Sequence, residues 1–265
     1  MPGHGSAAHC NEKSPKAMQT QSPQVHRHAL RPASIALGLF LTVLGTAVFV
    51  RLASPAAPEP ATPISPPRID VPNDSGSATE RTVFAGGCFW GVQGVFQHTL
   101  GVTSAVSGYA GGTPAAPSYE QVSSGGTGHA ESVEITFDPK QISYGRLLQI
   151  YFSVAHDPTQ LNRQDPDEGT QYRSEIFATS NAQQRAAEAY IAELDKARAF
   201  PHPIVTKVEP LQAFYPAESY HQDYATLHPD SLYIAAYDLP KIANLKKLYP
   251  EFYRERAVLV GGDQQ

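Results

Sequence analysis

The sequence has few cysteines, and their scarcity excludes several classes of protein. The chain of 265 residues contains two, so it is not a disulfide-rich scaffold and cannot hold zinc or an iron–sulfur cluster through several cysteine ligands. Positive charge is also scarce, because the chain has 20 Lys and Arg but 25 Asp and Glu, which gives a formal net charge of -5. This balance argues against a nucleic-acid-binding surface. Methionine is absent after Met18, which is consistent with work in an oxidising compartment.

One long apolar run stands near the start of the chain. Residues 33–50 carry no charge and meet the lower limit for a membrane-spanning helix. Basic residues precede this run, and no acidic residue lies between Glu12 and Glu59. The positive-inside rule therefore predicts a disordered, basic leader (residues 1–32, including Cys10) in the cytoplasm and an exported domain anchored to the membrane. A signal peptide cleaved near residues 53–56 is the alternative and would give a secreted or periplasmic protein.

Residues 51–80 are expected to form a linker. Seven prolines lie within residues 53–72, and a chain this rich in proline cannot form a hydrogen-bonded ladder. We expect an extended, semi-rigid spacer that holds the domain away from the membrane. The globular domain is expected over residues 81–250, followed by a tail over 251–265.

Hydrophobic periodicity within the domain predicts alternating short strands and helices. Strands are expected at residues 81–85, 102–107, 131–137, 175–179 and 204–209, and helices at 88–100, 143–154, 180–200, 217–227 and 239–248. Ser180 and Gln183 have the spacing of a capping box. Two polar loops are expected at residues 108–128 and 156–172. Short strands, one of them with clean alternation, favour an α+β fold with a mixed or antiparallel sheet over a doubly wound parallel one.

Cys88 is the only thiol of the domain and follows Gly86 and Gly87 at a predicted strand-to-helix turn. A cysteine in the first turn of a helix is favoured as a thiolate by unpaired backbone N–H groups and by the helix dipole. The structural alternative is a buried cysteine that acts as a small apolar side chain.

Glu131 is a candidate general acid because of its place in a strand. It shares a face with Val133, Ile135 and Phe137, so its carboxyl group is aimed at the apolar side. Desolvation would raise its pKa and keep it protonated near neutral pH. The alternative is a glutamate at a strand end that reaches solvent. His129 and Glu131 also match half of a zinc deaminase signature, but the cysteine pair of that signature is missing, so no metal is expected.

Six segments taken together resemble the A-type peptide-methionine sulfoxide reductases. They are GCFWGVQ, SGYAGG, PSYEQVSSGGTGHAE, DPKQISYGRLL, HDPTQLNRQDPDEGTQYRSEIF and FYPAESYHQDY. The match runs in order from about residue 81 to about residue 250. The resemblance implies a two-layer α+β sandwich with a ferredoxin-like core. It also implies that methionine S-sulfoxide, free or in oxidised proteins, is reduced to methionine without a cofactor.

The resemblance also implies roles for single residues. Cys88 matches the cysteine that attacks the sulfoxide sulfur and becomes a sulfenic acid, and Glu131 matches the acid that protonates the oxygen. Residues that match the substrate-binding positions are Tyr119 and Tyr172 for the oxygen, Asp167 beside them, and Phe89 and Trp90 for the S-methyl group.

The chain departs from many relatives in the residues that would recycle the sulfur. No cysteine follows Cys88, and Ser123 stands where some relatives have one. A disulfide within the domain is therefore excluded, and an external thiol is expected to reduce the sulfenic acid: a thioredoxin-like protein, a glutaredoxin with glutathione, or a small thiol. Cys10 could take part only from the same side of the membrane.

Two other functions fit the same residues. One is a cysteine hydrolase in which His129 or His156 serves as the base for Cys88. The other is a domain that binds oxidised methionine through Phe89 and Trp90 without reducing it.

Overall fold

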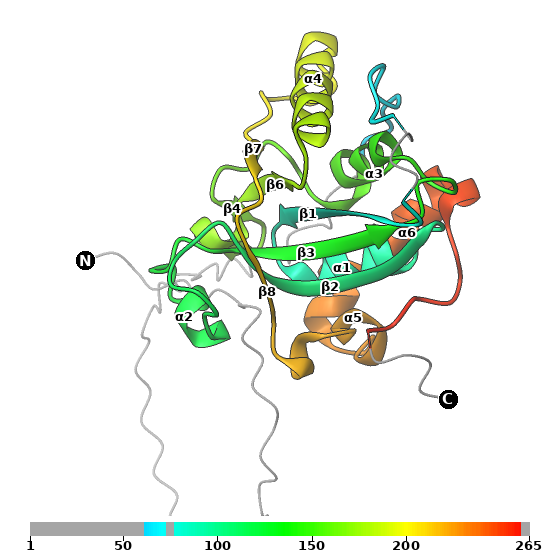
Figure 1. Ribbon diagram of the computed structural model, residues 1–265. Helices are drawn as coiled ribbons and strands as arrows, with labels where there is room; N and C mark the ends of the chain where they lie inside the picture. Colours follow the sequence, from blue (N-terminus) through cyan, green and yellow to red (C-terminus); the bar gives the residue numbers. More distant parts are fainter. Residues whose placement is uncertain (1–60, 73–76, 261–265) are drawn as a thin grey trace, which may run out of the picture. The chain divides into compact units, whose positions relative to one another are not determined.

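The computed structural model describes residues 61–72 and 77–260 (Figure 1). The predicted leader, the predicted membrane segment at residues 33–50, the first part of the linker and the last residues of the tail lie outside the described residues. Within residues 61–72 and 77–260, no helix is long and apolar enough to cross a membrane.

A six-stranded sheet organises the domain, with the strand order β7-β6-β1-β3-β2-β8 (Figure 1). The strands are β1 (Glu80–Gly86), β2 (Val102–Ala110), β3 (Ala130–Phe137), β6 (Ser174–Ala178), β7 (Lys207–Pro210) and β8 (Phe214–Pro216). Neighbouring strands are antiparallel except β6 and β7, which are parallel. The predicted α+β class with a mixed sheet is confirmed.

Most helices follow the strands nearly where periodicity predicts them, but of the α-helix expected at residues 217–227 only residues 224–227 form one. The longer helices are α1 (Phe89–Gln97), α3 (Tyr144–Ile150), α4 (Asn181–Ala197) and α6 (Leu239–Leu248), and the short ones are α2 (Tyr119–Ser123) and α5 (Tyr224–Leu227). A π-helical turn, η1 (Tyr151–Ala155), continues α3, and another, η4 (Ile234–Asp238), precedes α6. Single 3-10 turns are η2 (Thr170–Tyr172), η3 (Ser219–His221) and η5 (Pro250–Phe252).

Alternation along β1 separates two apolar clusters. Phe84 belongs to the main core, which also contains side chains of α1 and α3. Val83 and Ala85 point the other way, into a smaller cluster against which Leu211 and Phe214 pack. Both faces of the central strands are therefore buried, and a side chain on either face lies away from bulk water.

The two predicted loops contain structure that hydrophobic periodicity does not reveal. Ser118 and Gln121 form a complete capping box at the start of α2. The second loop contains a separate two-stranded hairpin, β4 (Arg163–Gln164) with β5 (Asp167–Glu168). The capping box expected at Ser180 is only half formed, because the Gln183 side chain accepts the N–H of Thr179 instead.

Part of the predicted spacer is docked on the domain. The N–H of Thr62 donates to the carbonyl of Ser153 at 3.0 Å, and the side chain of Gln149 donates to the carbonyl of Ile64 at 2.6 Å. Tyr190 donates to the carbonyl of Ser65 at 2.6 Å. Residues 61–72 form no helix or strand. They lie along the domain where we expected a free spacer, because their carbonyl groups accept hydrogen bonds from side chains of the domain.

Candidate active site

Glu131 lies on β3, on the face that points into the main core. Its side chain is fully buried, as the alternation along the strand predicts. The backbone N–H of Phe89 donates to its Oε2 at 3.0 Å, while Oε1 has no hydrogen-bond partner among the described residues. Burial raises the pKa of this carboxyl well above its ordinary value, and the nearby charges of Asp167 and Asp238 raise it further, against the opposing effect of the Phe89 hydrogen bond. This shift favours the neutral, protonated carboxyl, in which Oε1 can carry the proton.

Cys88 occupies the residue immediately before α1. The sequence places it in the first helical turn, but the helix begins at Phe89 and Cys88 is its N-cap. Gly87 precedes it with a φ of +89°, and a Cβ there would lie 2.5 Å from the Gln164 side chain, so only glycine fits this turn. Cys88 is 1% exposed, so its sulfur is buried.

Two tyrosines face Glu131 from the two polar loops. Tyr119 is the first residue of α2, and Tyr172 ends the turn η2. Their hydroxyl groups hydrogen-bond to each other, and burial together with the charges of Glu131 and Asp167 raises the pKa of both. Both remain protonated at any physiological pH, so each hydroxyl has one proton, which it can donate either to its neighbour or to an oxygen placed beside Glu131.

Asp167 joins this cluster from the hairpin β4–β5. It is 1% exposed, and one of its carboxylate oxygens accepts a hydrogen bond from the hydroxyl of Tyr233. The Tyr233 ring also meets Trp90 edge-on, with ring centroids 6.1 Å apart. Sequence reasoning missed Tyr233, because a single tyrosine in a polar segment carries no periodic or motif signal.

Phe89 and Trp90 form an aromatic wall with rings from a distant segment. Trp90 stacks on Tyr224 with centroids 3.9 Å apart, and Phe89 packs against His221 at 5.1 Å. His221 also lies 4.3 Å from the Tyr119 ring. Burial lowers its pKa to about 4, so the ring is neutral at physiological pH. Sequence reasoning missed this histidine too, although it falls within the quoted segment FYPAESYHQDY.

The two histidines considered as bases for a hydrolase have other surroundings. Both ring nitrogens of His156 are occupied, by the hydroxyl of Ser174 at 2.7 Å and by the carbonyl of Tyr151 at 3.1 Å. The buried ring of His129 lies edge-on to Tyr215 with centroids 5.9 Å apart. Within residues 61–72 and 77–260, no group of three or more His, Cys, Asp or Glu side chains could hold a metal ion.

Comparison with known proteins agrees with this geometry. The family model described as peptide methionine sulfoxide reductase matches residues 80–252. Peptide methionine sulfoxide reductase MsrA 2 of Mesorhizobium japonicum is 62% identical over 182 residues, which cover 69% of this chain and 93% of that protein. MsrA of Deinococcus radiodurans is 48% identical over 179 residues, covering 68% and 86%.

Solved structures give the same result. Methionine sulfoxide reductase A of Corynebacterium diphtheriae superimposes with a TM-score of 0.51 at 34% identity, covering 65% of this chain and 86% of the other. Reduced Mxr1 of Saccharomyces cerevisiae gives a TM-score of 0.52 at 33% identity, covering 59% and 90%. The chain therefore belongs to the MsrA family of peptide methionine sulfoxide reductases, enzymes that repair proteins by reducing methionine sulfoxide.

Proposed function

We propose that Cys88, as a thiol, reduces methionine S-sulfoxide with Glu131 as the proton donor. The observation that supports this most directly is the state of Glu131. Its carboxyl is buried and its pKa is raised well above the ordinary value, one oxygen is held by the amide next to Cys88, and the other oxygen has no partner among the described residues. A neutral acid also avoids the repulsion that an ionised carboxylate would exert on a nearby thiolate.

The reaction moves one oxygen atom and two electrons. The Cys88 sulfur forms a bond to the sulfoxide sulfur while Glu131 gives its proton to the sulfoxide oxygen. The oxygen then passes to Cys88 as a sulfenic acid that keeps the proton from Glu131, the bond between the oxygen and the substrate sulfur breaks, and methionine leaves. The proton of the Cys88 thiol returns to Glu131, which restores the acid. The Cys88 sulfur is oxidised by two electrons, and the methionine sulfur is reduced by the same two.

The surrounding residues would bind the substrate. Tyr119 and Tyr172 remain protonated and can donate to the sulfoxide oxygen, with Asp167 beside them. Phe89 and Trp90 offer an apolar wall to the S-methyl group. A side chain of this size could come from free methionine sulfoxide or from an oxidised residue in a protein.

An external thiol completes the cycle. Because no cysteine follows Cys88, the oxidised sulfur has to receive its electrons from outside the domain. A sulfenic acid, or a disulfide formed from it, is open to attack by a thiolate. We propose a thioredoxin-like protein, a glutaredoxin with glutathione, or a small thiol as the donor.

We also propose that the core of the fold is a two-layer sandwich of the ferredoxin-like type. Four central strands run in the order β6-β1-β3-β2, with α1 between β1 and β2 in the chain and α3 between β3 and β6. This alternation of helices with antiparallel strands supports the assignment.

The cellular position is proposed from the sequence. A helix over residues 33–50 would anchor the protein in a membrane with the catalytic domain outside the cytoplasm. Cleavage after this segment would instead release the domain as a secreted or periplasmic protein.

The test is turnover of the two sulfoxide diastereomers by the wild-type protein and by Cys88→Ser. With dithiothreitol as reductant, the wild type is expected to form methionine from L-methionine-S-sulfoxide and Cys88→Ser is expected to form none. Full activity in Cys88→Ser, or equal turnover of the R diastereomer by the wild type, would overturn the proposal.

A further inference from the structure

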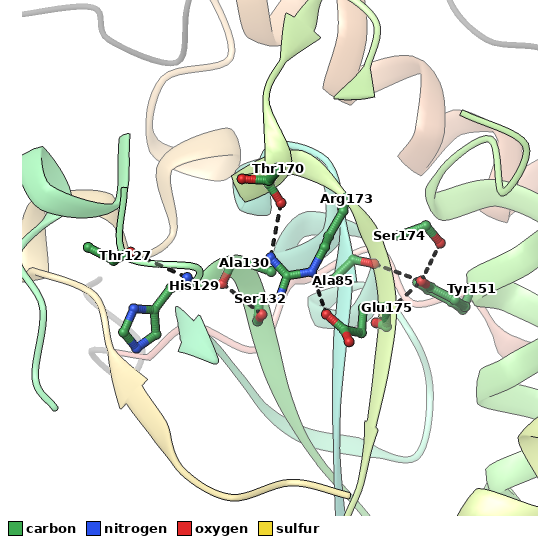
Figure 2. A network of polar contacts seen from close by, with 10 residues as sticks. All are labelled: Ala85, Thr127, His129, Ala130, Ser132, Tyr151, Thr170, Arg173, Ser174 and Glu175. Atoms are coloured by element: carbon green, nitrogen blue, oxygen red, sulfur yellow. Dashed lines mark hydrogen bonds and ion pairs between the residues drawn. The ribbon is translucent and has the colours of Figure 1, made fainter. Parts of the chain in front are cut away.

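A buried network of polar side chains lies behind the turn that carries Cys88. His156 Nε2 is 2.7 Å from the hydroxyl of Ser174, which in turn is 2.6 Å from the hydroxyl of Thr206. Tyr151 donates to the carbonyl of Ala85 at 2.7 Å and lies 3.0 Å from the Ser174 hydroxyl (Figure 2). All four side chains are buried, so water does not compete for these bonds.

The hydrogen bonds of this network have one consistent direction. His156 Nδ1 faces the carbonyl of Tyr151 at 3.1 Å, and because a carbonyl only accepts, Nδ1 carries the ring proton. Burial lowers the pKa of His156 to about 3, so Nε2 has no proton and accepts. Ser174 therefore donates to His156, and it accepts from Thr206. The hydroxyl protons of Ser174, Thr206 and Tyr151 then each have one acceptor, and the 3.0 Å contact between Tyr151 and Ser174 carries no proton of its own. A network with its protons assigned in this way is rigid.

The network holds the last residues of β1, immediately before Cys88. Gly86 pairs with Ser174 in the register of β1 and β6. The His156 ring packs directly on Gly86, because a Cβ at that position would lie 3.0 Å from the ring carbon Cγ. Tyr151 holds the preceding carbonyl, that of Ala85. The backbone from which Cys88 emerges is thus fixed by side chains on one side and by strand pairing on the other.

We propose that His156, together with Ser174, is a positioning residue for sulfoxide reduction. It fixes Ala85 and Gly86 so that Cys88 and Glu131 keep the relative position that the reaction needs. This inference rests on the proposed roles of Cys88 and Glu131. His156 itself transfers no proton, since both of its nitrogens are occupied inside the network.

Three variants separate positioning from packing. His156→Phe keeps a ring against Gly86 but removes both hydrogen bonds. His156→Gln can accept the Ser174 hydroxyl through its amide oxygen and is the conservative rescue. Ser174→Ala removes the hydroxyl at which the bonds converge. The matched control is Ser132→Ala, a buried serine whose hydroxyl donates only to the nearby carbonyl of Ala130, at 3.0 Å (Figure 2).

The measurement is a single turnover by the fully reduced, full-length protein without added reductant, over a range of L-methionine-S-sulfoxide concentrations. We expect the saturating rate constant of His156→Phe and Ser174→Ala to fall about tenfold to 100-fold, as small misplacements of reacting groups do. The substrate concentration at half-saturation should change less than about threefold, because the proposed substrate contacts are intact. His156→Gln should recover part of the rate, and Ser132→Ala should match the wild type.

Two results would overturn the inference, and one would overturn the proposed function instead. If His156→Phe and Ser174→Ala react at the wild-type rate, even with lowered unfolding temperatures, the network is only structural. A rate loss of the same size in Ser132→Ala would mean that the rate falls when any buried serine hydroxyl is removed, so the effect would not be specific to this network. If His156→Phe does not fold, Ser174→Ala decides the question. Failure of the wild-type protein itself to form methionine would reject the roles of Cys88 and Glu131.

Discussion

The backbone N–H of Phe89 donates to the carboxyl group of Glu131 across 3.0 Å. This bond ties the first residue of α1 to β3, so the proposed nucleophile at the helix N-cap and the proposed acid are held together by one amide. The sequence predicts that N–H groups at the start of this helix stabilise a thiolate at Cys88. In the structure the N–H of Phe89 donates to the carboxyl group of Glu131 instead. A carboxyl with one anchored oxygen presents its other oxygen in a fixed direction, as a general acid requires.

Replacement of Glu131 by glutamine is expected to separate chemistry from binding. The amide keeps the shape of the carboxyl and can still accept the Phe89 N–H, but it cannot deliver a proton. We expect the single-turnover rate of Glu131→Gln to fall about 10²-fold or more. The affinity for sulfoxide should stay within about threefold. Calorimetry measures this affinity, with Cys88→Ser present in both proteins so that no reaction occurs. An unchanged rate would exclude Glu131 as the acid.

The same substitution should change how stability depends on pH. Unfolded Glu131 loses its proton near its ordinary pKa, 4.5, whereas the folded group keeps it to a much higher pH. Above 4.5 the native state therefore binds a proton that the unfolded chain does not, and the stability of the wild type falls as pH rises. The unfolding temperature of Glu131→Gln minus that of the wild type should become more positive as the pH rises above 4.5. A difference that does not vary with pH would contradict the burial of a protonated carboxyl.

Tyr119 and Tyr172 are expected to act as a pair. Each Phe substitution removes one proposed donor to the sulfoxide oxygen and also removes the partner of the other hydroxyl. We expect each single variant to lose about tenfold to 100-fold in kcat/KM. The double variant should lose less than the product of the two, because hydrogen-bonded neighbours are not additive. Additive losses in this double-mutant cycle would mean that the two hydroxyls act separately.

Gly91 on α1 is predicted to be irreplaceable for a steric reason. A Cβ there would overlap Oδ1 of the buried Asp238. Gly91→Ala should lower the free energy of unfolding by about 1–3 kcal/mol or more, measured by denaturant unfolding. Gly126→Ala is the control, because its nearest neighbour would lie 3.6 Å away. Equal stability of the two variants would show that Asp238 moves aside at no cost.

Docking of residues 61–72 should contribute to the stability of the domain. Asp70 Oδ1 accepts the N–H of Gly145 in the first turn of α3, at 2.7 Å, as a capping side chain does. Asp70→Ala is expected to lower the free energy of unfolding by about 0.5–1 kcal/mol. Lys246→Ala removes an exposed ion pair with Glu255 and should leave stability unchanged. No loss in Asp70→Ala would mean that the segment is released in solution.

The local pattern of apolar and polar residues is enough to predict the fold class and the face of the strand to which the Glu131 side chain points. The alternation over residues 131–137 predicted that this carboxyl points inward, and the structure confirms it. The Gly86–Gly87 pair correctly placed Cys88 at a strand-to-helix turn. These features depend on neighbours in the chain, so a pattern of period two or a pair of glycines reveals them.

Features that depend on distant contacts were not predictable in this way. Tyr233 and His221 join the site from segments far along the chain, through a hydrogen bond to Asp167 and through ring packing. The docked segment at residues 61–72 was predicted as a free spacer, because proline content reports backbone preference and says nothing about which side-chain donors lie nearby. The short helix α2 was missed because its capping box lies in a stretch rich in glycine and serine.

The central claim is that Cys88 takes the oxygen atom from the substrate, and mass spectrometry of one turnover tests it most directly. Reduced Cys10→Ser protein, treated with an equal amount of L-methionine-S-sulfoxide and no reductant, should release one methionine per chain and gain the mass of one oxygen atom on the peptide that contains Cys88. The additional Cys88→Ser substitution should abolish both changes. Methionine formation without any added oxygen on Cys88, or an added oxygen elsewhere in the chain, would contradict the account.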